Sequence, residues 1–292
     1  MPSRHPQRAD REQREFFSVL PCDLARGDAR DLLAYPLFSL AKSARETPID
    51  LHVGELGIRV DAAAGHGIAT IWDADILIWA ARRIVEARDA GWPASAVLTA
   101  APDQILTAVG RGTCARDVHR LKAALTRLQS TSVAVSLRAP DERRDHRFSW
   151  LSEWTGHADA HGHCHTIELI LPTWLQGAVL DRAVALDGIG EYFRIRDGLE
   201  RWLYRVLRAQ SARTPAAPRF EFANLHARCA SQSSFKRFAF ELHEIARRQA
   251  LPGYQLRVEQ RPRGREFLVF EPATEQMADE TSHASQALGA AP

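Results

Sequence analysis

The feature that most constrains the fold is a pair of helical patterns followed by two short β-type runs between Phe220 and Phe270. In the longer helical pattern, apolar residues recur every three or four positions, which places them on one helix face. They are Phe235, Phe238, Ala239, Leu242, Ile245 and Ala246. A short helix is predicted before them over residues 222–230, with Ser231–Ser234 as a turn and helix start, and Pro252-Gly253 ends the longer helix.

The two β-type runs, Tyr254–Glu259 and Glu266–Phe270, are joined by the arginine-rich segment Arg261–Arg265. Helix, turn, helix and basic hairpin is typical of a winged helix-turn-helix, whose second helix can lie in a DNA major groove. The alternative interpretation is a helical hairpin capped by a β-hairpin with solvent-exposed arginines.

Positive charge is concentrated around this stretch. Residues 193–271 carry 16 Lys and Arg against 8 Asp and Glu, whereas residues 1–192 carry 22 against 25 and residues 272–292 carry none against 3. A near-neutral chain with one basic section favours a localised surface for a polyanion. Most of these cations are arginines, which suit bidentate contacts to phosphate and guanine.

The remaining composition limits the class of protein. With 292 residues, the chain can form one large or two ordinary domains. No apolar run approaches membrane-spanning length, so no membrane partner is expected. Its four cysteines are scattered without a CxxC pair, which argues against a disulfide framework or a zinc finger and favours the cytoplasm. A disordered arm is predicted over residues 1–27 and a disordered tail over residues 272–292.

The N-terminal half begins with a predicted hairpin, Ile49–Val53 with Leu56–Val60. A buried core helix is predicted to begin at Asp73, a suitable N-cap. Its apolar stripe is Ile76, Leu77, Ala80, Ile84 and Ala87.

A second helix-turn-helix outline follows in the same half. A short helix is predicted over Thr99–Val109, then a turn over Gly110–Thr113 that ends in a capping threonine, then a helix over Ala115–Gln129. A strand over Ser130–Leu137, a charged turn over Pro140–Arg147, and strands over Phe148–Trp154 and Thr166–Leu171 complete the outline. A single helix is predicted later, over Tyr192–Gln210. The expected fold class is therefore α+β, with two tandem winged helix-turn-helix domains over residues 28–180 and 181–271.

Histidines crowd into residues 157–165, with the sequence HADAHGHCH. Imidazole and thiolate are zinc ligands, but no second ligand pair lies at a finger-like distance, and a hairpin tip tolerates such residues. His163-Cys-His165 also resembles the two-histidine motif of metal-dependent DNA nickases, with Tyr192 or Tyr204 as nucleophile. Cysteine fits the central position of that motif poorly, so neither a metal nor a catalytic residue is predicted. No nucleotide-binding loop and no GxSxG element occurs.

Four blocks of sequence resemble the replication initiator protein A family of bacterial plasmids. They are YPLFSLAK (35–42), GIATIWDADILIWA (67–80), GRGT (110–113) and SSFKRFAFEL (233–242). The resemblance spans roughly Asp28 to Phe270, and more distantly the plan resembles iteron-binding initiators built from two winged-helix domains. It implies a protein that is not an enzyme and needs no cofactor.

The resemblance also implies a set of DNA-binding residues. In the C-terminal domain, which makes the main contacts in that family, these are Ser233, Ser234, Lys236, Arg237, Arg247 and Arg248 on the recognition helix, and Arg261, Arg263 and Arg265 in the wing. In the N-terminal domain, they are Thr113, Arg116 and Arg120.

The partners implied are double-stranded DNA with repeated origin sites, the host initiator and replicative helicase, and a second copy of the chain in a monomer–dimer equilibrium. A plain transcriptional repressor is the first alternative, because it would use the same DNA-binding parts. A metal-dependent nickase is the second.

Overall fold

A computed structural model describes residues 14–15, 37–53, 56–92, 95, 97–139, 142–181, 184–185, 189–211 and 219–273. The predicted arm and tail lie outside these ranges, apart from residues 14–15, 272 and 273. The chain divides into two compact units, and among the described residues the division falls between Phe193 and Arg194. We refer to them as the N-terminal unit and the C-terminal unit. The domain boundary expected after residue 180 falls inside helix α4 (Thr173–Asp181).

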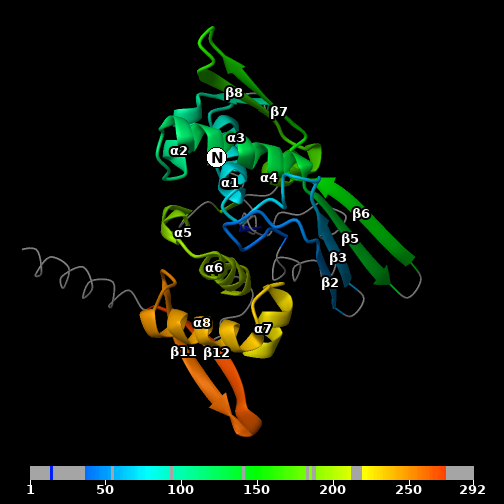
Figure 1. Cartoon of the computed structure of the whole chain (residues 1–292), viewed down its shortest axis with the longest axis vertical. Helices are drawn as coiled ribbons and strands as arrows, with labels where there is room; N and C mark the ends of the chain where they lie inside the picture. Colours follow the sequence, from blue (N-terminus) through cyan, green and yellow to red (C-terminus); the bar gives the residue numbers. More distant parts are fainter. Residues whose placement is uncertain are drawn as a thin grey trace, which may run out of the picture. The chain divides into compact units, whose positions relative to one another are not determined.

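Within the ranges given above, the N-terminal unit contains two antiparallel sheets of three or more strands (Figure 1). The first has the order β2-β3-β5-β6, formed by β2 (Ile49–Val53), β3 (Leu56–Asp61), β5 (Ser132–Ala139) and β6 (Glu142–Ser149). The second has the order β4-β8-β7, formed by β4 (Val97–Ala100), β7 (Glu153–Ala158) and β8 (Cys164–Ile170). The helices described in this unit are α1 (Ala74–Asp89), α2 (Pro102–Ala108), α3 (Ala115–Ser130), α4 and all but the last residue of α5 (Ile189–Arg194). The two-residue strands β1 (Arg14–Glu15) and β9 (Val184–Ala185) also pair, in parallel.

The predicted strand over Ser130–Leu137 is present as β5, but two neighbouring predictions are wrong. The strand predicted over Phe148–Trp154 is instead the end of β6 and the start of β7, with residues 150–152 between them outside any strand. The predicted charged turn over Pro140–Arg147 is largely the strand β6, which pairs with β5 from Ser149 to Glu142. Strand β6 is an edge strand of its sheet, where charged side chains are common, and its charge concealed it in the sequence. Strand β5 joins the sheet of the β2–β3 hairpin, so the second predicted outline is completed by β7 and β8 alone.

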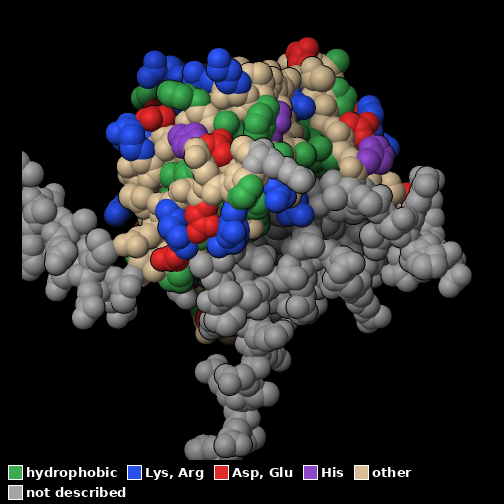
Figure 2. All heavy atoms as spheres, turned by 90° about the horizontal axis from the view of Figure 1, so that it is seen from below, with side chains coloured by type: hydrophobic (Ala, Val, Ile, Leu, Met, Phe, Trp, Pro, Cys, Tyr) green, Lys and Arg blue, Asp and Glu red, His purple; other side chains and the backbone are tan. Residues whose placement is uncertain are grey.

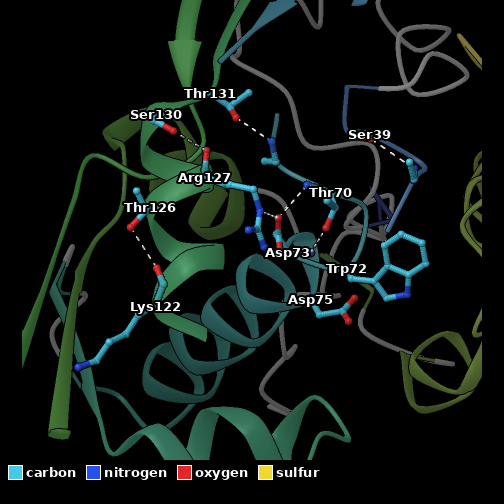
Figure 3. Close-up of polar contacts among 12 residues, drawn as sticks. Ser39, Thr70, Trp72, Asp73, Asp75, Lys122, Thr126, Arg127, Ser130 and Thr131 are labelled. Carbon is cyan, nitrogen blue, oxygen red and sulfur yellow. Dashed lines mark hydrogen bonds and ion pairs between the residues drawn. The ribbon is translucent and has the colours of Figure 1, made fainter. Parts of the chain in front are cut away.

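Helix α1 is the buried core helix predicted from the sequence. Asp73 occupies its N-cap position, but the Asp73 carboxylate makes no capping hydrogen bond to the helix. It accepts two hydrogen bonds from the Arg127 guanidinium of α3, at 2.8 and 2.9 Å, and one from the Thr70 backbone N–H at 2.8 Å (Figure 3). The Thr131 hydroxyl at the end of α3 accepts from the backbone N–H of Ala69. The block around residues 67–80 therefore holds α3 against the start of α1.

In its described residues, the C-terminal unit has three α-helices and one antiparallel sheet. The helices are α6 (Gly198–Ser211), α7 (Phe222–Arg228) and α8 (Phe235–Arg248). The sheet has the order β10-β12-β11, formed by β10 (Arg219–Glu221), β11 (Tyr254–Arg261) and β12 (Arg265–Pro272), with the short 3-10 helix η4 (Pro262–Gly264) joining the last two. Its core includes Trp202, Leu203, Phe222, Phe238, Leu242, Leu268 and Phe270.

The single helix predicted over Tyr192–Gln210 is two helices, α5 (Ile189–Arg194) and α6. The carboxylate of Asp197 accepts hydrogen bonds from the backbone N–H groups of Leu199 and Glu200, at 2.9 and 3.2 Å. An aspartate that satisfies the first N–H groups of a helix marks a new helix start. The Asp197-Gly198 signal for a break was therefore present in the sequence.

Both units use the same order of elements around their second and third helices. In the N-terminal unit, the order is α1, β4, α2, α3, β7 and β8, with β5 and β6 inserted after α3. In the C-terminal unit, it is α6, β10, α7, α8, β11 and β12. In each, the strand before the second helix pairs with the last strand of the hairpin. We call β7–β8 the N-terminal hairpin and β11–β12 the C-terminal hairpin (Figure 1).

Candidate nucleic-acid interface

The start of α8 is fixed by its serines, as the sequence predicted. Ser234 is the N-cap, and its hydroxyl accepts from the backbone N–H of Arg237 at 3.4 Å. In the preceding turn, the hydroxyls of Ser231 and Ser233 are 2.8 Å apart. The His226 Nε2 of α7 lies 2.9 Å from the Ser233 carbonyl oxygen, so α7 and the turn are joined by a hydrogen bond. These contacts give the first turn of α8 a defined direction.

The outward side of α8 combines cations with one aromatic ring. Lys236, Arg237, Phe240 and Arg247 are exposed on it, and Glu244 is half-buried. Arg237 Nε donates to Glu241 Oε1 at 2.7 Å, and Arg247 donates to Glu244 Oε2 at 2.7 Å. The hydrogen bond from Arg247 lowers the pKa of Glu244. Exposed pairs within one helix contribute little stability, so these arginines can exchange their partners for a phosphate or a base.

Arg248 has a different position from the other predicted residues of α8. Its guanidinium donates to Glu200 Oε1 of α6 at 2.7 Å. Glu200 is buried, and this burial raises the pKa of its carboxyl although Arg248 acts in the opposite direction. Arg248 therefore ties the end of α8 to the start of α6, whereas Lys236 and Arg237 lie at the other end of α8.

The C-terminal hairpin brings Arg261 and Arg265 together, since the two residues face each other in the β11–β12 register. Both are exposed. The Arg265 guanidinium lies 5.9 Å from the Phe267 ring centroid, and Arg261 is 3.8 Å from Glu259. Gly264 between them has a φ of 71°, a conformation that glycine adopts without strain. The side chain of Arg263 is outside the described part of the structure.

Helix α3 occupies the corresponding place in the N-terminal unit. The predicted cap Thr113 is wrong, because the N-cap residue is Cys114. The Cys114 thiol donates to Asp117 Oδ2 at 3.0 Å, and this hydrogen bond lowers the pKa of Asp117. Arg120 is paired with the same carboxylate at 3.4 Å, and both Arg116 and Arg120 are exposed. The first turns of α3 therefore present two arginines, one of which faces an acid.

The histidine cluster forms the tip of the N-terminal hairpin. Asp159 shapes the turn, because its Oδ1 accepts from the backbone N–H groups of His161 and His163 at 2.9 Å each. These hydrogen bonds, that of His163 first, lower the pKa of Asp159. Within the described residues, no three His, Cys, Asp or Glu side chains are grouped to hold a metal ion. The two tyrosines considered as nucleophiles, Tyr192 and Tyr204, are only 0% and 2% exposed.

We compared the chain with families of known proteins. A sequence profile of the family described as "Replication initiator protein A" matches residues 27–256. The chain belongs to this family. The predicted resemblance is therefore confirmed, and the match includes α8 but ends within β11, before the arginines of the C-terminal hairpin.

One relative of this family member also carries a replication name, and two solved structures have a similar fold. The chain is 25% identical over 230 residues to a protein of Wigglesworthia glossinidia brevipalpis that carries the provisional name of replication protein, covering 77% of this chain and 82% of that one. Among solved structures, domains 2 and 3 of RctB match with a TM-score of 0.63 and 14% identity, over 88% of this chain and all of that one. A second structure of those RctB domains matches with a TM-score of 0.59, also at 14% identity, over 84% of this chain and 97% of that one. These structures establish a shared fold.

Sequence reasoning missed two features of this family member. It assigned Phe235 to the buried face of α8, but the residue is 47% exposed, and it overlooked Phe240, which is 57% exposed. The spacing from Lys236 to Phe240 is four residues, so a helical projection could have placed both on the outward side. Figure 2 shows Lys and Arg side chains in separate groups on one face, with acidic and hydrophobic side chains between them. No helix in the described ranges is long and apolar enough to cross a bilayer.

Proposed function

We propose that this family member is a plasmid replication initiator that binds repeated sites in double-stranded DNA through two tandem winged-helix units. The observation that carries the proposal is the outward side of α8, where Lys236 and Arg237 are the second and third residues after the N-cap Ser234. The recognition helix of this class places its N-terminal residues on base edges in the major groove. The shared order of elements in the two units supports the tandem arrangement.

In this proposal, the C-terminal unit makes the main contacts. Lys236, Arg237 and Arg247 contact bases and phosphates, and the C-terminal hairpin contacts the backbone through Arg261, Arg263 and Arg265. The N-terminal unit adds weaker contacts through Arg116 and Arg120 and mediates self-association. Two linked modules raise the affinity for a long site even when each binds weakly alone.

The proposed action is not enzymatic. Binding energy would open an adjacent segment of the origin, and the host initiator and helicase would then load in the cytoplasm. The burial of Tyr192 and Tyr204 supports this proposal over a nickase, because a nucleophile must reach a DNA phosphate. A nickase would instead cleave a supercoiled origin with Mg²⁺ or Mn²⁺ and remain attached to the DNA.

The test is a footprint on the DNA flanking the gene at moderate salt. We expect protection of short direct repeats by the full chain and weaker protection by Arg237→Ala. The absence of any protected repeat would contradict the proposal. A transcriptional repressor would give the same footprint, so the second measurement is maintenance of a plasmid that lacks any other initiator, which a repressor cannot support.

A further inference from the structure

An exposed phenylalanine lies in the middle of the outward side of α8. Phe240 is 57% exposed, whereas Phe238, two residues earlier, is fully buried in the core of the C-terminal unit. A single exposed apolar residue is ordinary on a protein surface. The neighbours of Phe240 make it unusual, since three cations and an acid surround it on the same helix.

These neighbours follow from helix geometry. Lys236 and Glu244 lie four residues before and after Phe240, Arg237 lies three before and Arg247 seven after, so all share one side of α8. The Arg237 guanidinium is 5.8 Å from the Phe240 ring centroid. Phe235, the other exposed phenylalanine of α8, instead packs edge-to-face on His226, with ring centroids 5.6 Å apart. Phe240 thus belongs to the cationic side, and Phe235 to the contact with α7.

The cations select a polyanion as the partner of this surface. If α8 enters a major groove, Lys and Arg can satisfy phosphates and the acceptor edge of guanine, but a phenyl ring can satisfy neither. The apolar group that base pairs present in the major groove is the C5-methyl of thymine. A ring in the centre of the groove-facing side therefore has one suitable partner on the edge of a base pair.

We propose that Phe240 reads a thymine by contact with its C5-methyl group, next to the base contacted by Arg237. This inference rests on the proposed function, because it specifies one base in the site that α8 recognises. Phe240 also lies against Arg237, so the ring limits the directions available to that guanidinium when it leaves Glu241.

The test uses the full chain and a duplex that carries its footprinted repeat. Each thymine is replaced in turn by deoxyuridine, which removes the methyl group and leaves the Watson–Crick edge unchanged. We expect one position at which wild-type affinity falls by about fourfold, the effect of losing one buried methyl group. In Phe240→Ala, affinity for the thymine duplex should fall, and the thymine and deoxyuridine duplexes should bind equally at that position.

Phe235→Ala is the matched control, since it removes an exposed phenylalanine that lies off the cationic side. It should keep the wild-type preference for thymine, and circular dichroism should show that both variants fold. Specific binding with no deoxyuridine effect at any position would overturn the assignment of Phe240 and leave the proposed function standing. A thymine preference that persists in Phe240→Ala would also overturn it.

Two other results would point to a partner other than a thymine in duplex DNA. If Phe240→Ala weakens binding to a single-stranded oligonucleotide and deoxyuridine has no effect in the duplex, the ring stacks on an unpaired base and the proposal is wrong. If the wild-type chain prefers no duplex sequence, the proposed function itself fails.

Discussion

The third helices of the two units, α3 and α8, are each held by an ion pair to the first helix of their unit, which we call the tether. The two helices differ in the side chains that they expose. Each carries an arginine near its C-terminal end that binds an acid near the start of the first helix of its unit: Arg127 with Asp73, and Arg248 with Glu200. The scaffold that orients the helix is therefore built twice, whereas the exposed first turns are not alike.

The two helices first differ in charge at their third residue. In α8, this position is Arg237, and in α3 it is Asp117, which pairs with Arg120. The hairpins diverge in the same way, because the C-terminal hairpin carries arginines and the tip of the N-terminal hairpin carries histidines. Arginine is charged at all physiological pH values, whereas histidine is largely neutral above pH 7. The two units thus share an order of elements but differ in the charged side chains that they expose.

The largest expected effect concerns the shared tether. Arg127→Ala leaves the buried carboxylate of Asp73 without its ion-pair partner, and we expect a loss of about 3–5 kcal/mol in the stability of the N-terminal unit. Arg248→Ala should cost the C-terminal unit less, because a carboxyl whose pKa is already raised, that of Glu200, takes up a proton more readily. Hydrogen exchange of α1 and α6 peptides in the full chain reports each unit separately. An equal or reversed effect would show that the two tethers do not differ in this way.

The next effect concerns the exposed first turns. Arg237→Ala should weaken specific DNA binding by about 1–3 kcal/mol, or roughly 5- to 150-fold, because it removes a bidentate interaction with a base. Arg120→Ala should cause a smaller loss, because in the proposed function the N-terminal unit makes the weaker contacts with DNA. Titration of a fluorescent repeat duplex at constant salt measures both. A larger loss for Arg120→Ala would assign the main reading role to the N-terminal unit.

The two hairpins should differ in salt dependence more than in specificity. Replacing Arg261, Arg263 and Arg265 with glutamine should weaken binding to all sequences alike and reduce the slope of log K against log salt by about 0.9 for each phosphate that is no longer neutralised. The corresponding change of His157, His161, His163 and His165 to glutamine at pH 8 should leave the slope unchanged. If the histidine variant loses as much slope as the arginine variant, the hairpins are equivalent.

The smallest effect comes from cysteine modification. Burial raises the pKa of Cys229 to about 12, so its thiol stays protonated and inaccessible at pH 8, whereas Cys114 is exposed at the N-cap of α3. In a background with Cys22→Ser and Cys164→Ser, iodoacetamide should modify Cys114 and spare Cys229, as peptide mass spectrometry would show. The adduct should weaken DNA binding slightly if the start of α3 is an accessory contact. A strong loss would contradict the accessory role.

Local signals predicted much of this fold. The serines before α8, the apolar spacing within it and Pro252-Gly253 before β11 gave the elements of that stretch, because caps and periodicity act within a few residues. Long-range pairing was less accessible. Strand β6 was concealed by its charges, and nothing near Asp73 in the sequence indicates Arg127, 54 positions away.

The candidate site shows the same limit. The cations of α8 were identified from the family resemblance, but the exposure of Phe235 and Phe240 depends on how α7 and α8 pack, which spacing alone leaves open. Similarly, the pair between Arg248 and Glu200 separates one predicted DNA-binding arginine from the others only after α6 is placed.

The most direct test of the account is the selection of duplexes from a random-sequence pool at moderate salt by the wild-type chain and by Arg237→Ala. We predict that the wild type enriches a single motif and that Arg237→Ala loses the preference at one base pair of it while keeping the rest. Enrichment of no motif by the wild type, or of an unchanged motif by Arg237→Ala, would contradict the claim that α8 reads the DNA.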